Sequence, residues 1–187
     1  MKQREIIKQL SDKELKKQLF LSQAILLGIA ILLSLIFFNS FSDWLVYIEW
    51  NEKEVLLFGI IPGLIIVIFD LFLMKIFPKH ALDDGGINER ILRGQPIGFI
   101  FLLSIFVSIS EELLFRGVIQ TTFGYIVASV IFALVHFRYL TKPILFVSIV
   151  MVSFIIGYLF EITENILVTI FAHFTVDFLL GLIIRFK

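Results

Sequence analysis

Residues 97–120 read IGFIFLLSIFVSISEELLFRGVIQ. The stretch is apolar from Ile97 to Ile109, and Glu111, Glu112 and Arg116 then follow within the same segment. About 20 apolar residues are enough for a helix to cross the hydrocarbon core of a bilayer. The stretch therefore predicts a transmembrane helix with ionisable groups inside the membrane, where such groups indicate a functional site by default.

The same apolar length recurs along the chain, which predicts an all-α fold, a polytopic membrane bundle of about six helices. The predicted spans are residues 20–38, 55–77, 97–120, 123–137, 143–160 and 166–186, of which the fourth is short. Residues 1–19 carry six Lys and Arg beside an apolar set, which predicts a cytoplasmic amphipathic helix leading into the first span. Residues 20–187 are then a single transmembrane bundle.

The composition excludes several classes of protein. Of the 187 residues, 59% are hydrophobic and 17% are charged, whereas an ordinary soluble domain is about 45–50% apolar and roughly 25% charged. A soluble globular protein and a disordered chain are both excluded. Sixteen basic and sixteen acidic side chains cancel, so nothing indicates a nucleic-acid partner. The lack of cysteine excludes a disulfide scaffold, an iron–sulfur cluster, a thiol nucleophile and cysteine-bound zinc.

The positions of the basic residues predict the orientation in the membrane. With a cytoplasmic N-terminus, fourteen of the sixteen Lys and Arg fall in cytoplasmic segments, Lys53 lies outside and Arg116 is intramembrane. Cytoplasmic loops of membrane proteins carry an excess of Lys and Arg. Both termini and the loop at residues 138–142 are therefore predicted to be cytoplasmic.

The spacing of the intramembrane charged residues along a helix predicts which of them pair with one another. Glu112 and Arg116 are four residues apart with the acid first, the favourable order, and are predicted to form a structural ion pair. Glu111 points about 100° away from Glu112 on a helix, so it is the carboxylate left for chemistry. His173 and Asp177 are also four residues apart and project from one face of the last span.

His136 completes the candidate set, and its i−4 neighbour Phe132 places an aromatic ring beside the imidazole. With a rise of about 1.5 Å per residue, the four groups Glu111, His136, His173 and Asp177 converge near the middle or inner half of the membrane. Isolated polar residues in a bundle often only hydrogen-bond helices together. Four titratable groups from three helices at one depth favour a functional site instead.

Other residues are predicted to be structural. Asp70 stands near the inner end of the second span without a spaced partner. Asn165 is placed to cap the last helix, since its side chain can accept from the free amides there. Small residues allow close contact between helices, and the candidates are Gly28, Gly59, Gly63, Gly157 and Gly181.

These residue types suit hydrolysis of a peptide bond. A carboxylate beside an imidazole in a water-accessible cavity can activate water as a general base. A second imidazole with an Asp can polarise the carbonyl and hold the oxyanion that forms. Glu111, His136 and His173 could instead bind zinc and leave one position for water. The chain contains neither the HExxH sequence of one-helix zinc sites nor a GxSxG serine motif.

The metal-independent interpretation is favoured. A tightly held catalytic zinc needs partners that fix each imidazole, and the sequence offers only Asp177 for His173 and nothing comparable for His136. A Glu111–His136 pair that activates water needs no such support. No cofactor is therefore favoured, and zinc is the alternative.

Three segments resemble the motifs of one family. Glu111-Glu112-Leu-Leu-Phe-Arg116 resembles EExxxR, Phe132-Ala-Leu-Val-His136 resembles FxxxH, and His173-Phe-Thr-Val-Asp177 resembles HxxxN/D. Together they resemble the CPBP family, the CAAX proteases and bacteriocin-processing enzymes also called the Abi family, over residues 97–180. The resemblance implies an intramembrane endopeptidase of the type II CAAX prenyl protease class, which is also described as a metalloprotease. Glu111 would be its base, His136 the partner in activating water, and His173 and Asp177 the stabilisers of the transition state.

Asp177 departs from the pattern, because the prenyl protease members typically have Asn at this position. An ionised Asp donates no hydrogen bond to an oxyanion. This puts a direct oxyanion role in doubt and leaves three alternatives: Asp177 binds a cation, holds His173, or is protonated because it is buried.

The predicted substrate is a membrane-associated peptide or membrane protein, such as a leader peptide or a pheromone. The Lys-, Ile- and Phe-rich composition indicates a low-GC bacterium, in which prenylated substrates are unexpected. Two other function classes stay open. A non-catalytic bacteriocin self-immunity or membrane scaffold protein would keep its function when motif residues are changed. A proton-coupled transporter would use the Glu, His and Asp groups as a relay, but inverted repeats typical of transporters are not found.

Overall fold

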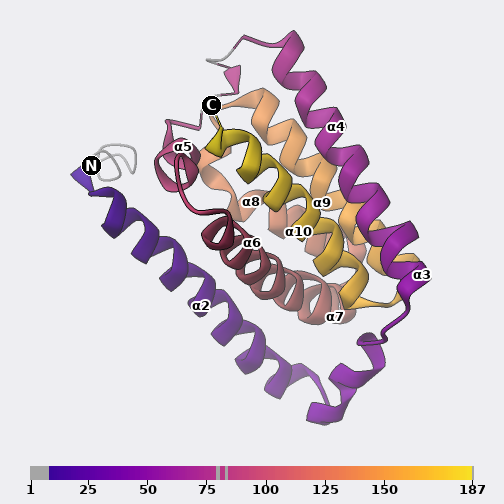
Figure 1. Ribbon diagram of the computed structural model, residues 1–187. Coiled ribbons are helices and arrows are strands. Elements are labelled where there is room, and N and C mark those ends of the chain that lie inside the picture. Colours follow the sequence, from indigo (N-terminus) through magenta and orange to yellow (C-terminus); the bar gives the residue numbers. More distant parts are fainter. Residues whose placement is uncertain (1–8, 79–80, 83, 187) are drawn as a thin grey trace.

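The computed structural model describes residues 9–78, 81–82 and 84–186, and every regular element in these ranges is helical. Five helical segments there are long and apolar enough to cross a membrane. They are Asp12–Phe37, Glu52–Ile76, Ile97–Phe123, Pro143–Thr163 and Ile166–Arg185. The remaining predicted span is α8 (Tyr125–Val135), an apolar helix of 11 residues. The predicted all-α helical bundle is confirmed (Figure 1).

The first span, α2 (Asp12–Phe37), begins at a capping box. The Ser11 side chain accepts a hydrogen bond from the Glu14 backbone, and the Glu14 carboxylate accepts one from the Ser11 backbone at 2.8 Å. Because no Gly or Pro interrupts its first half, the helix runs without a break through residue 19. Residues 12–19 of the predicted lead-in helix thus belong to the same helix as the first span, and the amphipathic role of residues 1–19 stays a prediction. Residues 1–8 of that predicted helix lie outside the described residues.

The second span consists of three consecutive pieces. They are α3 (Glu52–Glu54), the π-helical turn η2 (Val55–Ile60) and α4 (Ile61–Ile76). Short helices lie in the connections before and after it, namely the 3-10 helix η1 (Phe41–Tyr47) and α5 (Ile87–Leu92). The connections at both ends of this span are therefore partly helical.

The third span changes its helix type part of the way along. The α-helix α6 (Ile97–Glu112) continues directly into the π-helix η4 (Leu113–Gln120) and the single turn α7 (Thr121–Phe123). Gly124 then adopts a φ of +86°, a conformation that glycine reaches without steric cost, and α8 starts at the next residue. The turn between the third and fourth spans is therefore at Gly124 and not at residues 121–122, the gap between the predicted spans 97–120 and 123–137.

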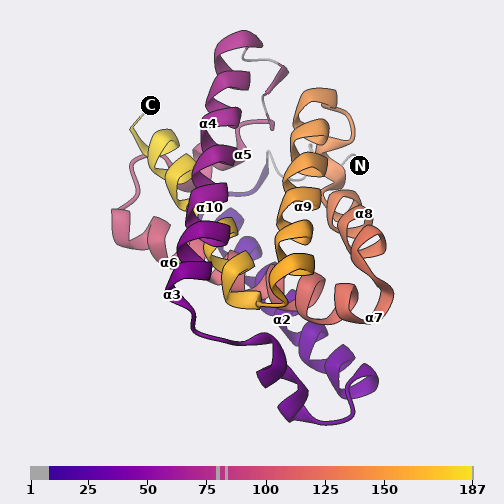
Figure 2. The same cartoon turned by 90° about the vertical axis from the view of Figure 1, so that its right-hand side faces the viewer.

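The last helix, α10 (Ile166–Arg185), lies at the centre of the bundle against α6, α4 and α9 (Pro143–Thr163) (Figures 1 and 2). A Cβ atom on Gly63 of α4 would lie 2.8 Å from the Ala172 carbonyl oxygen. A Cβ atom on Gly181 would lie 2.8 Å from Cγ2 of Ile100. Small residues at these crossings let α10 approach both neighbours closely, as is common between membrane helices.

Two residues predicted to be structural have clear partners. The Asn165 side chain accepts a hydrogen bond from the backbone N–H of Leu167 at 3.0 Å, so the predicted cap of the last helix is confirmed. Asp70 of α4 accepts a hydrogen bond from Oγ of Ser148 on α9 at 2.8 Å. The partner of Asp70 is on another helix, which explains why spacing along the sequence does not reveal it.

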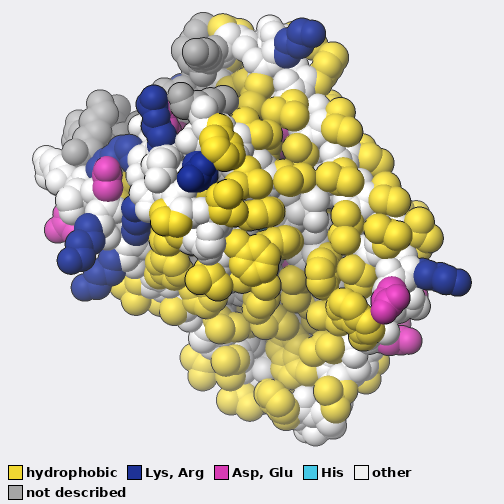
Figure 3. Space-filling model, in the orientation of Figure 1, with side chains coloured by type: hydrophobic (Ala, Val, Ile, Leu, Met, Phe, Trp, Pro, Cys, Tyr) yellow, Lys and Arg dark blue, Asp and Glu magenta, His cyan; other side chains and the backbone are white. Residues whose placement is uncertain are grey.

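The two ends of the bundle differ in charge. The start of α2, the end of α4, the 3-10 helix η5 (Phe137–Tyr139) and the end of α10 lie at one end, whereas η1 and α7 lie at the other (Figures 1 and 2). Most of the basic side chains visible in Figure 3 gather at the first end, and hydrophobic side chains cover most of the rest of that face. The orientation relative to the cytoplasm stays a prediction.

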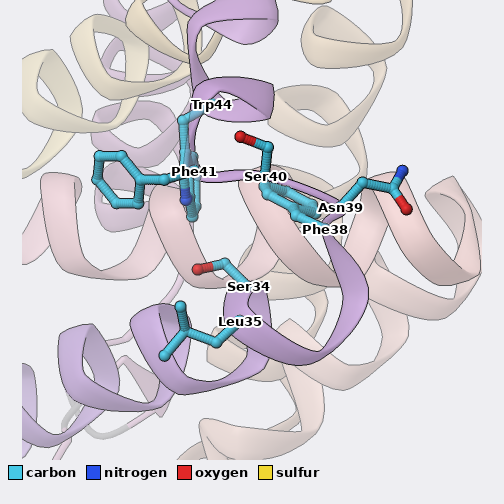
Figure 4. A pocket seen from close by; sticks show the side chains of 7 residues that line it. All are labelled: Ser34, Leu35, Phe38, Asn39, Ser40, Phe41 and Trp44. Atoms are coloured by element: carbon cyan, nitrogen blue, oxygen red, sulfur yellow. The ribbon is translucent and has the colours of Figure 1, made fainter.

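Two hollows open at the end formed by η1 and α7. One of about 150 Å³ lies between the end of α2 and η1, where Ser34, Phe38 and Trp44 line it (Figure 4). The other, of about 430 Å³, lies between the same two elements and α7, where Thr121 and Thr122 line it. None of the predicted site residues lines either hollow.

Candidate active site

The two adjacent glutamates of α6 face different partners. Glu112 is fully buried; its Oε2 lies 3.3 Å from Nε of Arg116, and its Oε1 accepts a hydrogen bond from Nδ1 of His173 at 2.8 Å. Glu111 is also buried, and its Oε1 accepts a hydrogen bond from Nε2 of Gln23 on α2 at 3.0 Å. One carboxylate is therefore directed to α10 and the other to α2. The change from α- to π-helix follows directly, and π-helical turns are frequent at functional sites.

Arg116 is fully buried and donates hydrogen bonds to several helices. Besides Glu112, its guanidinium donates to Oε1 of Gln120 and Oγ of Ser129, each at 3.4 Å. It also donates to the carbonyl oxygen and the Oγ of Ser153 at 3.0 and 3.3 Å. A buried charge is costly unless it is paired and hydrogen-bonded. Here the carboxylate supplies the charge and the other acceptors occupy the remaining N–H groups, which makes the pair tolerable inside the bundle.

The space for this guanidinium exists because α9 has a glycine beside it. A Cβ atom on Gly157 would lie 2.9 Å from Nη1 of Arg116 and 2.7 Å from Oγ of Ser129. Gln120 donates both to the Gly157 carbonyl oxygen at 2.9 Å and to Glu161 at 3.0 Å. The polar chain thus extends along α9 from the buried arginine to an exposed glutamate.

His173 is held on both ring nitrogens. Its Nδ1 donates to Glu112, because an ionised carboxylate can only accept. Its Nε2 lies 3.5 Å from Oδ2 of Asp177, one turn further along α10. The His173 side chain is 8% exposed and the Asp177 side chain 35%. Asp177 is therefore more accessible to solvent than His173.

His136 has one ring nitrogen bound and one available. The residue follows the last residue of α8, and its Nδ1 lies 2.8 Å from the carbonyl oxygen of Phe132. A carbonyl oxygen only accepts, so Nδ1 carries the proton and Nε2 of the neutral ring has a free lone pair. No described residue forms a hydrogen bond with that Nε2. The ring is stacked on Tyr139 with centroids 6.1 Å apart, which helps to fix its orientation.

The buried ring of Phe132 connects the two histidines. Its centroid lies 4.9 Å from that of His136 and 6.0 Å from that of His173. On the same ring, Cζ of Arg116 lies 5.3 Å from the centroid, a distance at which a cation is attracted by the aromatic face. Phe132 therefore brings both imidazoles and the guanidinium around a single side chain.

Direct contacts join four of the six predicted site residues: Glu112, Arg116, His173 and Asp177. His136 reaches this group through the Phe132 ring. Among the described residues, no hydrogen bond joins Glu111 to His136, the two residues that the sequence predicts to act together on water. Within the same ranges, no three His, Asp or Glu side chains are arranged to hold a metal ion, and this includes the alternative zinc set.

Sequence reasoning misses the uncharged polar residues that surround these groups. They are Gln23, Ser110, Gln120, Ser129 and Ser153. Each is a polar residue within an apolar segment, which is a signal, but such residues are common in membrane helices. What distinguishes these five is the partner on another helix, and the sequence does not show it.

Fold and site together define a class: a multi-pass membrane protein with carboxylates, imidazoles and one arginine enclosed by its helices. The family model for "Type II CAAX prenyl endopeptidase Rce1-like" matches residues 93–179, which hold all six predicted site residues. The chain is also 37% identical over 167 residues to the uncharacterized protein YpbD of Bacillus subtilis (strain 168), covering 89% of this chain and 88% of that protein. No solved structure matches the chain.

The chain therefore belongs to the Rce1-like family of type II CAAX prenyl endopeptidases, and the resemblance to the CPBP family is confirmed. Membership places it among membrane proteases of the CAAX type, which act on peptide substrates at the bilayer.

Proposed function

We propose that this protein is an intramembrane endopeptidase that hydrolyses a peptide bond in a membrane-associated peptide or membrane protein. The observation that carries the proposal is the pair of imidazoles on the Phe132 ring. His136 offers an unbonded Nε2, whereas His173 has its Nδ1 proton fixed by Glu112. One imidazole with a free acceptor nitrogen and one with a fixed proton are suited to distinct roles in one acid–base reaction.

Glu111 is the general base of the proposed reaction. Its Oε1 is held by Gln23, and its Oε2 has no hydrogen bond to a described residue. A water that donates to Oε2 is oriented by a second hydrogen bond to Nε2 of His136. As the water oxygen attacks the carbonyl carbon of the substrate, its proton passes to Glu111. Glu111 returns that proton to the leaving amine nitrogen when the C–N bond breaks.

His173 is proposed to stabilise the oxyanion. In its imidazolium form, Nδ1 donates to Glu112, and the single Nε2–H is shared between the negative oxygen and Asp177, whose Oδ2 lies 3.5 Å away. Asp177 lacks the proton that a direct oxyanion contact needs when it is ionised, so its proposed role is to hold His173. The proposed reaction uses no metal, because each of its proton transfers has a protein group assigned to it.

We further propose that the protein resides in a bacterial cell membrane with its basic end in the cytoplasm. His136 lies at the end of α8 that leads into η5, which is the basic end of the bundle. A substrate would then approach the site from the cytoplasmic half of the membrane.

The test is cleavage of quenched-fluorescent peptides by the purified protein in lipid vesicles. A peptide with a farnesylated cysteine near its C-terminus is compared with the same peptide without the lipid. Glu111→Gln should lower turnover by roughly 10²–10⁴-fold, the usual contribution of a positioned general base. Glu52→Gln, at an exposed glutamate of α3, is the matched control and should cleave like the wild type.

Full turnover by Glu111→Gln together with loss in Glu112→Gln would reverse the roles of the two carboxylates. Absence of cleavage by the wild type, with motif variants that keep their function in cells, would instead favour the non-catalytic immunity or scaffold protein.

A further inference from the structure

The buried face of α2 carries a single amide among apolar side chains. Leu15 and Leu19, on the N-terminal side, pack with residues of α5 and α6. On the C-terminal side, Leu26 and Ala30 pack against η4. Gln23 lies between these two contacts and is 5% exposed. Because a buried amide is unfavourable without partners, its hydrogen bonds indicate why a polar residue occupies this position.

Both ends of the Gln23 amide are engaged by neighbouring residues of α6. Its Nε2 donates to Oε1 of Glu111 at 3.0 Å, and its Oε1 lies 2.7 Å from Oγ of Ser110. The Ser110 hydroxyl also lies 2.7 Å from the carbonyl oxygen of Phe106, one turn earlier. Ser110 can therefore donate in either of two directions.

We infer that Gln23 is a positioning residue for Glu111, an inference that rests on the proposed function. While Glu111 is ionised, the amide donates to Oε1 and leaves Oε2 directed to the reacting water. After Oε2 has taken the proton, Oε1 is the carbonyl oxygen of the neutral acid and still accepts from the Gln23 amide, so the new O–H stays directed to the leaving amine. Ser110 fixes the amide in this orientation by donating to its Oε1. The Gln23–Ser110 pair thus holds the base in both protonation states.

Attachment of α2 to the bundle does not require this amide. Phe20, one turn before Gln23, stacks on Phe106 with ring centroids 5.8 Å apart. The apolar contacts with η4 hold the other half of the helix. In addition, α2 lies outside the region matched by the family model, residues 93–179. The first span therefore supplies the site with a group that the matched region does not contain.

The test uses the peptide that the wild-type protein cleaves in vesicles. Gln23→Met keeps the length of the side chain and removes both polar atoms. We expect its kcat to fall by roughly 10–100-fold, the effect of losing one hydrogen bond to an ionised group. Its KM should stay within about twofold, because Gln23 is placed to act on the base and not on the bound peptide. Gln23→Glu should lose at least as much, since an ionised glutamate cannot donate to Glu111.

A pair of serines on α6 provides the matched control. Ser110→Ala removes the partner of Gln23 and should lower kcat in the same way. Ser108→Ala changes an equally buried serine whose Oγ donates to the carbonyl oxygen of Ile105 in its own helix at 3.1 Å, and it should keep kcat. Turnover is expressed per folded protein, determined by thermal unfolding of each sample.

Wild-type kcat in Gln23→Met, with Glu111→Gln inactive, would overturn this inference and leave the proposed function standing. An equal loss in Ser108→Ala and Ser110→Ala would also overturn it, because packing alone would then explain the effect. Retained turnover by Glu111→Gln would overturn the proposed role of the base, and the inference with it.

Discussion

Replacing Arg116 with Met removes the positive charge from the centre of the bundle and leaves Glu112 behind. Both side chains of this pair are 0% exposed, so water cannot replace the lost partner. Removing one member of a buried ion pair costs about 3–5 kcal/mol in the free energy of unfolding. Glu112 still accepts the hydrogen bond from His173 at 2.8 Å. Four other acceptors lose the N–H groups of Arg116, and nothing replaces these donors. We therefore expect Arg116→Met to lower the free energy of unfolding by about 3–5 kcal/mol.

Unfolding in mixed micelles of increasing sodium dodecyl sulfate content measures this free energy. Trp44 is a suitable fluorescent reporter, because it is buried and lies so close to η4 that a Cβ atom on Gly117 would be 2.5 Å from its ring. The matched control is Arg93→Met, which breaks an i,i+4 ion pair with Glu89 whose side chains are more than half exposed. An exposed pair contributes only about 0–1 kcal/mol.

Equal destabilisation in Arg116→Met and Arg93→Met would refute the reasoning, because burial would then not determine the cost. A double variant provides a second check. Adding Glu112→Gln to Arg116→Met removes the stranded charge and should recover part of the lost free energy. If the double variant lost more free energy of unfolding than the sum of the two single variants, the ion-pair explanation would be contradicted.

Three further predictions concern orientation, packing and metal. A single cysteine placed at residue 138, in a chain that has none, should react with impermeant reagents only from the cytoplasmic side; labelling from outside would invert the proposed topology. Gly157→Ala should lower the free energy of unfolding by about 1–3 kcal/mol, since its Cβ would overlap the Arg116 guanidinium. A Cβ atom on Gly28 would meet open space, so Gly28→Ala should not destabilise the protein. Equal losses in the two variants would argue against the close approach of Gly157 to Arg116. Protein washed with a chelator should keep its turnover, whereas zinc that is lost and restored in proportion to activity would establish a metal enzyme.

The spans could be predicted because the length of an apolar run is a local property of the chain. The same is true of the Asn165 cap, which lies next to the helix that it caps. The π-helix η4 could not be predicted, because its residue types do not distinguish it from an α-helix. Nearly all of its side chains are buried against α2, α8 and α10, so contacts with other helices set its geometry.

The site shows the same division between local and distant contacts. Glu112 with Arg116, and His173 with Asp177, are close in the sequence, and a spacing of four places each pair on one helix face. The bond from His173 to Glu112 joins residues 61 positions apart, and the bond from Gln23 to Glu111 joins residues 88 positions apart. Contacts of this kind depend on how the helices are aligned along their axes, which one sequence does not specify.

The hydrogen bonds of Arg116 limit which helices can move when a substrate enters. The guanidinium donates to acceptors on η4, α8 and α9 as well as α6. Sliding one of these helices by a single residue, about 1.5 Å along its axis, would break bonds that are already 3.0–3.4 Å long. The third, fourth and fifth spans therefore behave as one rigid body. Widening of the bundle for a bulky peptide then falls to α4, which has no hydrogen bond to Arg116 among the described residues.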